Sequence, residues 1–371
     1  MSDLCVLQRV FCMVLTVLVI GCSEGGTGGT GGITPPDTTT VSMSGYDHKG
    51  PFQAGSTVRV TQLSQTGESE LVLGTTEIVS NLGDYHITLE ASGPLKIDVS
   101  GSYFSETAGE YAAGGIELTA IMDPVDGNNL VNVNLLTHLI HSRVLHLISD
   151  GSIDVAQAIE MAQSELLLAF SDLLPPPDGP VEFSSLLVIN SIQEGDDETG
   201  NAYLLALSSV LEQNAANLAI INNTDLLVEF GSFIDQLEAD LGNDGVLDLS
   251  LEVKADLRQS MSEIIPSDVY LNLLKIDELR DLAIQASDLT AQATPPEFGE
   301  TVIWVNDSFE FSADVDGDVP LTARTRAADI MADMDLFIDS DGDGVVNSDD
   351  EDDDGDGSVD EGDVTPYGDG Q

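Results

Sequence analysis

The residues of this chain best suited to chemistry are carboxylates near its C-terminal end. Residues 339–363 read DSDGDGVVNSDDEDDDGDGSVDEGD, with acidic residues at nearly every second position and no basic residue among them. A calcium loop of about twelve residues places oxygen ligands at positions 1, 3, 5, 7, 9 and 12, with glycine at position 6 and an inward apolar residue at position 8. The acidic run fits this template twice, beginning at Asp339 and again at Asp352.

Both matches keep the ligands and the turn glycine in place. Gly344 and Gly357 take the turn position, and Val346 and Val359 are expected to point inward. Oxygen ligands in this number suit Ca²⁺, so the pattern predicts a calcium-binding tail. The alternative is a solvated acidic tail. The predicted ligands are Asp339, Asp341, Asp343, the carbonyl of Val345, Asn347 and Asp350 in the first loop, and Asp352, Asp354, Asp356, the carbonyl of Ser358, Asp360 and Asp363 in the second.

The tandem spacing of the two loops resembles thrombospondin type 3 repeats, in which the chain wraps around a string of calcium ions. The resemblance implies Ca²⁺ as the cofactor, although the cysteines of that family are missing and only two repeats are present. An EF-hand matches less well, because the loops follow one another without helices between them and lack Glu at position 12. Carboxylates closer than a Debye length of about 8 Å repel one another, so we expect calcium to order the tail.

Little else in the sequence suggests catalysis. A helix would spread His138, His141 and His146 along its polar edge rather than around one metal ion, so we expect surface or boundary histidines. Arg143 falls in the apolar stripe of the same segment and needs a carboxylate or carbonyl partner. Residues 242–245, Gly-Asn-Asp-Gly, are better explained by a turn between helices than by a calcium loop. Without serine-hydrolase, P-loop or dinucleotide motifs, we predict no enzyme.

The composition indicates a folded but strongly anionic protein. The 371 residues include 66 acidic and 11 basic side chains, giving a net charge of −55, while apolar residues make up 42% of the chain. A disordered polyanion would lack that apolar fraction. The charge repels nucleic acid and favours divalent cations, although adaptation to salty or calcium-rich water would explain the acidic body equally well.

Residues 1–22 predict a lipoprotein signal. Their apolar run, residues 10–20, is too short to span a bilayer and suits the core of a signal peptide. The run leads into Val-Ile-Gly-Cys at residues 19–22, which resembles the lipobox of bacterial lipoproteins and implies lipidation of Cys22. The Gly-, Thr- and Pro-rich residues 23–40 predict a flexible tether. The expected location is the outer membrane or cell surface.

Residues 41–123 predict a small β-sandwich. Short runs of alternating polar and apolar residues, such as STVRVTQL and LKIDVSG, are separated by turn residues about every ten positions. The stretches KGPFQAGSTVRV, TTEIVSNLGDYHI and PLKIDVSGSYF resemble carboxypeptidase-regulatory-like, transthyretin-type modules, which are mostly spacers and binding scaffolds. Tyr103, Phe104 and Tyr111 are candidates for a ligand surface, although such aromatics more often cap a core.

Residues 128–294 predict an all-α helical bundle. Six segments carry apolar residues at helical spacing and are broken by Gly, Pro or Asn. Residues 298–338 then predict a short hairpin around Trp304 and a connector that includes a short helix, before the acidic tail of residues 339–371.

The predicted fold class is therefore multidomain α+β, with a β-sandwich, a helical bundle and an acidic calcium-loop tail. KGPF at residues 49–52 and VNVNLLT at residues 131–137 resemble a recurrent type of bacterial surface lipoprotein, which implies location but no activity. We expect a lipid anchor in the outer membrane and adhesion or recognition of an extracellular protein or glycan. The alternative is a glycan-binding or glycan-hydrolysing component of carbohydrate utilisation, with two carboxyls about 5 to 10 Å apart beside aromatics.

Overall fold

The computed structural model describes residues 38–177, 179–187, 198–264, 268–269, 272–273, 275, 302–305, 308–311, 334–355 and 357–360. The chain divides into two units, Met1–Pro36 and Asp37–Gln371, and only the second contains described residues. The predicted signal, Cys22 and the tether up to residue 37 lie outside the described residues. Mixed α and β content confirms the coarse fold class, with two main sheets and five helices.

The longer strands of the two main sheets follow the alternation of polar and apolar residues in the sequence. One sheet has the order β3-β2-β5-β6, all antiparallel, and the other has the order β4-β1-β7 with β8 also paired to β1. The strands are β1 (Thr39–His48), β2 (Thr57–Leu63), β3 (Ser69–Glu77), β4 (Asp84–Ala91), β5 (Leu95–Gly101), β6 (Ile116–Met122), β7 (Gly127–Leu130) and β8 (Val133–Asn134).

Strand β1 is the central strand of its sheet and has two kinds of neighbour. It pairs antiparallel with β4, from Thr39 opposite Ala91 onward, and parallel with β7 and β8. Residues 127–134, placed at the start of the helical segment by the sequence, therefore belong to this sheet. Their Gly- and Asn-rich sequence gives no alternation from which short parallel strands could be recognised.

Five of the six expected helical segments are helices. They are α1 (Leu135–Ile148), α2 (Val155–Phe170), α3 (Glu198–Asn222), α4 (Leu226–Asp244) and α5 (Leu251–Ser262), with short 3₁₀ turns η1 (Phe183–Ser185) and η2 (Asn347–Asp349). The sixth segment, residues 267–289, lies mostly outside the described residues. The predicted hairpin is present as β9 (Val302–Val305) and β10 (Ser308–Phe311), which pair antiparallel.

Side-chain caps fix the helix boundaries. Asn134 begins α1 with a capping box, in which its side chain accepts from the Thr137 amide and the Thr137 hydroxyl accepts from the Asn134 amide. Gly245 ends α4 in the left-handed conformation, with φ 82° and its amide donating to Leu241 O at 2.8 Å. The expectation of a turn between helices at residues 242–245 is therefore wrong for residues 242–244, which are the last residues of α4, and only Gly245 lies beyond the helix.

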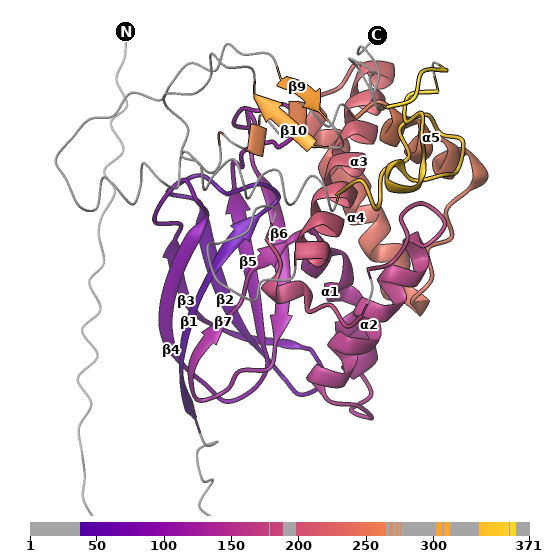
Figure 1. Cartoon of the computed structure of the whole chain (residues 1–371). Coiled ribbons are helices and arrows are strands. Elements are labelled where there is room, and N and C mark those ends of the chain that lie inside the picture. Colours follow the sequence, from indigo (N-terminus) through magenta and orange to yellow (C-terminus); the bar gives the residue numbers. More distant parts are fainter. Residues whose placement is uncertain are drawn as a thin grey trace, which may run out of the picture. The chain divides into compact units, whose positions relative to one another are not determined.

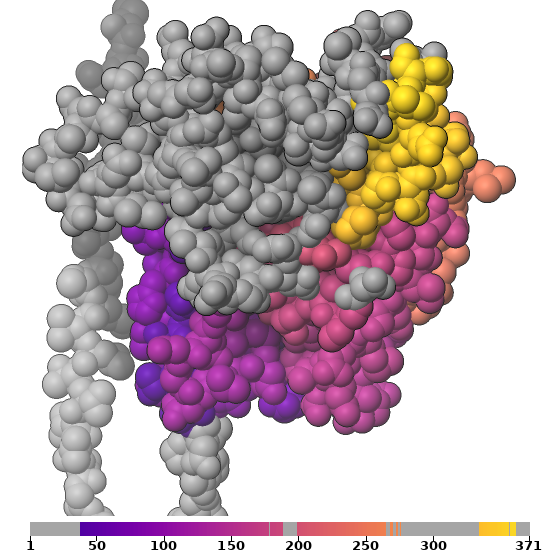
Figure 2. Space-filling view, viewed as in Figure 1, coloured from indigo at the N-terminus to yellow at the C-terminus, as the bar shows by residue number. Residues whose placement is uncertain are grey.

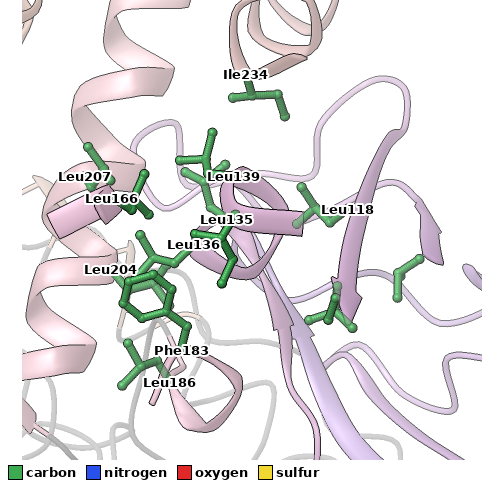
Figure 3. Packing of buried hydrophobic residues seen from close by; sticks show 14 of the residues in the cluster. Leu118, Leu135, Leu136, Leu139, Leu166, Phe183, Leu186, Leu204, Leu207 and Ile234 are labelled. Atoms are coloured by element: carbon green, nitrogen blue, oxygen red, sulfur yellow. The ribbon is translucent and has the colours of Figure 1, made fainter. Parts of the chain in front are cut away.

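The hydrophobic core is continuous from the sheets into the helices. Helices α1, α2 and α4 contact β6 (Figure 1). Nearly all residues of β6 are therefore buried, whichever face of the sheet they lie on, whereas buried and more exposed residues alternate along much of β1. Helix α1 lies at the centre of this core, with Leu135, Leu136 and Leu139 all fully buried among side chains from the neighbouring elements (Figure 3). Helix α3 contains a stretch long and apolar enough to cross a membrane, Thr199–Asn222, yet 61% of an apolar 18-residue window within it is buried inside the structure.

Candidate functional site

Three aspartates of the first acidic loop bring their carboxylate oxygens together. Asp339, Asp341 and Asp343 each offer one oxygen, and these oxygens lie within 4.8 Å of one another. Gly342 and Gly344 allow the tight turns between them, because their φ angles of 78° and 98° are rarely adopted by other residues. Within the described part of the chain, this is the one group of acidic, His or Cys side chains close enough to share a metal ion.

Backbone amides hold Asp339 at the centre of the loop. Its Oδ1 accepts from Gly342 N at 2.8 Å and its Oδ2 from Gly344 N at 3.0 Å. Despite these hydrogen bonds, partial burial and the charges of Asp341 and Asp343 raise the pKa of Asp339 above its ordinary value. An opposite charge nearby would favour the ionised form. The electrostatics of the loop therefore favour a bound cation.

The second acidic loop repeats the backbone conformation of the first at the spacing of Asp339 to Asp352. The amide of Gly357 donates to Asp352 Oδ2 at 2.9 Å, as Gly344 does to Asp339. Gly355 and Gly357 also repeat the left-handed conformation, with φ 66° and 93°. Two further hydrogen bonds of the first loop recur in the second. Ser340 N donates to Asn347 Oδ1, and correspondingly Asp353 N donates to Asp360 Oδ1. Asn347 N donates to Ile338 O, and correspondingly Asp360 N donates to Glu351 O.

Two of the predicted ligands of the first loop, Asn347 and Asp350, make hydrogen bonds within the acidic segment. Asn347 is buried, and its side chain accepts from Ser340 N at 3.0 Å and donates to Ser340 Oγ at 2.9 Å. Asp350 accepts from the amides of Glu351 and Asp352 and is not part of the aspartate group. The Asn347 side chain thus joins two parts of the loop through Ser340.

The second loop is described only in part. Asp352, Asp354, Ser358 and Asp360 are described, whereas Asp356 and Asp363 lie outside the described residues. The two valines expected to point inward differ from the prediction. Val359 is 55% exposed and Val346 is half-buried, whereas the polar residues Asn347 and Asp353 are buried.

The segment that enters the first loop is anchored on the helices. Met334, Phe337 and Ile338 are buried in the common core, and the Phe337 ring meets Tyr203 of α3 edge-on at 5.4 Å. The Asp339 amide contacts the sulfur of Met261 in α5 at 3.4 Å. Figure 2 shows the described C-terminal residues against the helical part. Of the short helix expected before the acidic tail, residues 334–337 are described, and they form mainly a turn.

A second cluster, which the sequence analysis missed, lies buried between the sheets and α3. We call Lys49, Glu106 and Glu212 the buried lysine cluster. Lys49 follows β1, Glu106 lies between β5 and β6, and Glu212 is on α3. The Lys49 Nζ lies 2.6 Å from Glu106 Oε1 and 3.1 Å from Glu212 Oε2, and all three side chains are at most 2% exposed.

Hydroxyl groups and aromatic rings complete this cluster. Glu212 accepts from Tyr103 at 2.7 Å, Ser105 at 3.0 Å and Thr107 at 2.6 Å, whereas Ser208 donates to Glu106 Oε1 at 2.5 Å. The rings of Tyr103 and Phe230 each lie 5.4 Å from the Lys49 Nζ. Among the described atoms, Glu106 Oε2 is buried without a hydrogen-bond partner.

The two glutamates of the cluster are electrostatically different. Burial raises the pKa of Glu106, and Lys49 only partly opposes this. Burial also acts to raise the pKa of Glu212, but the Lys49 charge and the hydrogen bonds from Thr107 and Tyr103 hold it below its ordinary value. Burial opposes the charge of Lys49, yet the two glutamates raise its pKa. The cluster is thus a Lys49–Glu212 ion pair beside a carboxyl that tends to be neutral.

The chain matches no known protein family, no curated protein and no solved structure. Its function has to be inferred from the residues and geometry of the two clusters.

The cluster gives KGPF, residues 49–52, a structural role. A Cβ on Gly50 would lie 2.1 Å from Phe104 O, so only glycine allows the loop to approach this closely. Phe52 is fully buried beside the Tyr103 ring. Tyr103 and Phe104 are themselves buried, so they cap the core rather than line a ligand surface.

The remaining sequence candidates on α1 contact neighbouring helices. Arg143 finds the predicted carboxylate, since its Nε and NH2 atoms lie 2.6 Å and 2.8 Å from the two oxygens of Glu165. His138, expected at a surface or boundary position, is buried where α4 covers that edge of α1, with its Nε2 3.8 Å from Asp235. His141 Nε2 lies 3.3 Å from Glu238 Oε1 on α4. His146 is exposed.

Proposed function

We propose that this chain is a lipid-anchored, calcium-binding cell-surface protein with a non-enzymatic role in adhesion or recognition. The observation that carries the proposal is the convergence of Asp339, Asp341 and Asp343 in a loop whose backbone conformation recurs from Asp352. Ca²⁺ is favoured over Mg²⁺ because the available donors are carboxylate and carbonyl oxygens on a flexible loop, whereas Mg²⁺ demands tight octahedral geometry and keeps its waters.

The architecture that we propose follows the sequence. Cys22 carries the lipid, residues 23–40 form the tether, the two sheets make a β-sandwich, and the five helices form part of a bundle. The acidic tail packs on this bundle through Phe337 and Ile338. In this arrangement, bound calcium stiffens the acidic loops that follow Phe337 and Ile338.

A binding role is supported over hydrolysis by the position of the paired carboxylates. Glu106 and Glu212 lie together beside aromatic rings, as the two acids of a glycosidase do, but both are fully enclosed and cannot reach a glycan. In the described part of the chain, no observation favours hydrolysis as a second candidate.

Isothermal titration with calcium and magnesium tests the metal assignment. We expect calcium uptake by the unaltered protein with an affinity on the order of 10⁻⁴ to 10⁻³ M, as for extracellular calcium modules. The double variant D341N/D343N should lose one class of site, and D352N/D354N should lose the other. The matched control, D244N/D248N, removes the same charge from the end of α4 and the segment after it, and should bind as the unaltered protein does. Equal uptake by all four proteins would show that the acidic loops are not the sites.

A further inference from the structure

The buried lysine cluster brings a primary amine and two carboxyl groups together where water is excluded. The Lys49 Nζ and Glu106 Oε1 are 2.6 Å apart, and both side chains are 0% exposed. We propose that Lys49 and Glu106 condense to form an intramolecular amide, an isopeptide bond, with Glu212 as the acid–base group. This modification is independent of calcium binding and of the function proposed above.

Glu106 is the acceptor of the new bond on three grounds of geometry. It is the nearer of the two carboxyls to the Lys49 Nζ. Its Oε1 accepts from the Ser208 hydroxyl, which would stabilise charge on that oxygen when the amine attacks. Its Oε2 has no hydrogen-bond partner and is free to leave as water. The neutral acid is the form that condenses, and burial favours that form.

Glu212 is placed to move the protons. Its Oε2 lies 3.1 Å from the Lys49 Nζ, within the reach of a general base. The hydroxyls of Tyr103, Ser105 and Thr107 hold the carboxylate in place. Because these groups also stabilise its ionised form, proton transfer from the ammonium is uphill. The condensation is therefore a slow event that happens once in each molecule after folding.

The step balances in atoms and charge. The ammonium of Lys49 gives one proton to the Glu212 carboxylate, and the resulting amine attacks Cδ of the protonated Glu106. The tetrahedral intermediate then loses its hydroxyl, which leaves with the second amine proton as water. The products are a neutral amide, a neutral Glu212 and one water molecule. No oxidant, cofactor or metal takes part, and the only co-product is water.

A second lysine–carboxylate pair shows which features are special to the cluster. Lys96 Nζ lies 2.9 Å from Asp98 Oδ1, but Lys96 is 23% exposed and Asp98 is also bound by Arg59 and Thr119. Water therefore reaches the amine, and no second carboxylate faces it as a base among the described contacts. Lys96 serves as an internal control in the same molecule.

Tryptic peptide mapping of the denatured full-length protein tests the proposal. Trypsin cannot cleave after an acylated lysine, so we expect the bond after Lys49 to stay intact. We also expect a branched peptide that joins Lys49 to Glu106 and is lighter than its parts by one water. Cleavage after Lys96 should be complete. Complete cleavage after Lys49 with unmodified peptides would overturn the proposal. A peptide that is lighter by one water but does not join Lys49 to Glu106 would also overturn it.

Two variants separate the chemistry from simple packing. Glu106→Ala removes the acceptor and should restore cleavage after Lys49. Glu212→Gln keeps the size of that side chain and one accepting oxygen but removes the base, so the branched peptide should disappear while the circular dichroism spectrum remains that of the folded protein. If the Glu106 variant still gave a branched peptide at Lys49, Glu106 would not be the acceptor. If a folded Glu212 variant still gave it, Glu212 would not be the base. The peptide map of the unaltered protein decides the proposal even if a variant does not fold.

Discussion

Arg143 shows what a single charged residue does inside an apolar helix face. It is 8% exposed and binds both oxygens of Glu165, which is 26% exposed. Replacing Arg143 with Met leaves a largely buried carboxylate without its cation, so we expect a loss of about 3 kcal/mol in the free energy of unfolding. Urea denaturation measures this loss.

The matched control for this prediction is the ion pair between Lys254 and Asp172. Asp172 is 71% exposed, so Asp172→Asn should cost less than about 1 kcal/mol. Adding Glu165→Gln to the Arg143 variant should recover part of its loss, because the unpaired charge is then removed. Equal costs at the two pairs would mean that burial does not set the strength of the Arg143 interaction.

Buried histidines predict a stability that falls in acid. Burial, together with the nearby charges of His138 and Lys96, lowers the pKa of His141 from 6.5 to about 4, and burial lowers that of His48 to the same range. The unfolded chain therefore takes up these protons first. Their contribution is fully present above about pH 6.5 and is lost as the pH falls toward 4, by up to about 3 kcal/mol for each histidine.

The pH dependence of unfolding of single-histidine variants tests this account. His141→Gln should flatten the loss between pH 6.5 and 4, whereas the exposed His146→Gln should not change it. Glu238 opposes the effect, because burial raises its pKa and the folded state then gains stability as this group is protonated. The nearby Asp98 also opposes the effect, because it acts to raise the pKa of His141. Identical profiles for the two variants would show that His141 does not carry the dependence.

At the scale of elements, the acidic tail and the helices are joined by a few buried side chains. Phe337 is 2% exposed against Tyr203, directly before the loop that starts at Asp339. Calcium bound to this loop should therefore stabilise the helical part. At about tenfold above the dissociation constant the gain is about 1.4 kcal/mol, seen as a higher melting temperature in calcium than in magnesium.

Phe337→Ala tests whether the gain is transmitted through this contact. The substitution should cost about 3 kcal/mol and reduce the calcium-dependent rise in melting temperature. Leu336→Ala is the control, because Leu336 is 40% exposed and should leave the rise intact. An undiminished rise in the Phe337 variant would mean that the tail binds calcium without any coupling to the helices.

How well each element could be predicted depended on the length of its pattern. Helices α1 to α5 and strands β2, β4, β5 and β6 follow runs of polar and apolar residues that the sequence shows directly. The short strands β7 and β8 carry no such run, and their parallel pairing depends on where β1 lies in space. Periodicity is a local signal, so it cannot report a partner more than eighty residues away.

The acidic loops and the buried lysine cluster show that local sequence predicts only sites whose residues lie close together in the chain. Asp339, Asp341 and Asp343 lie within one short loop, so spacing alone could bring them together. Lys49, Glu106 and Glu212 come from three distant segments, and nothing in their local sequences indicates that they meet. The hydrogen bond between Asn347 and the Ser340 hydroxyl inside the loop could not be read from the spacing either.

At the scale of the whole molecule, one continuous core predicts one unfolding transition. Side chains from both sheets and all five helices belong to the same cluster of buried residues, and the buried lysine cluster lies between them. We therefore expect two urea unfolding curves to coincide, one measured by helical circular dichroism and the other by the near-ultraviolet signal of the buried Tyr85 and Tyr103.

Lys49→Met extends this test. It removes the partner of both buried glutamates and leaves the Glu212 carboxylate without a cation, so both signals should shift to lower urea together, by about 3 kcal/mol or more. Arg59→Met removes a half-exposed cation from the sheet surface and should shift both only slightly. Separate transitions for the two signals would show that sheets and helices unfold independently.

The central position of β1 has a mechanical consequence. The strand begins at Thr39, is bonded on one side to β4 and on the other to β7 and β8, and ends at His48 beside Lys49. A pull on the chain before Thr39 acts along this strand, so the hydrogen bonds on both sides share the load and must rupture together. A strand at the edge of the sheet, drawn away sideways, would instead unzip bond by bond. The strand that the N-terminal segment enters is thus the strand of this sheet best placed to resist tension.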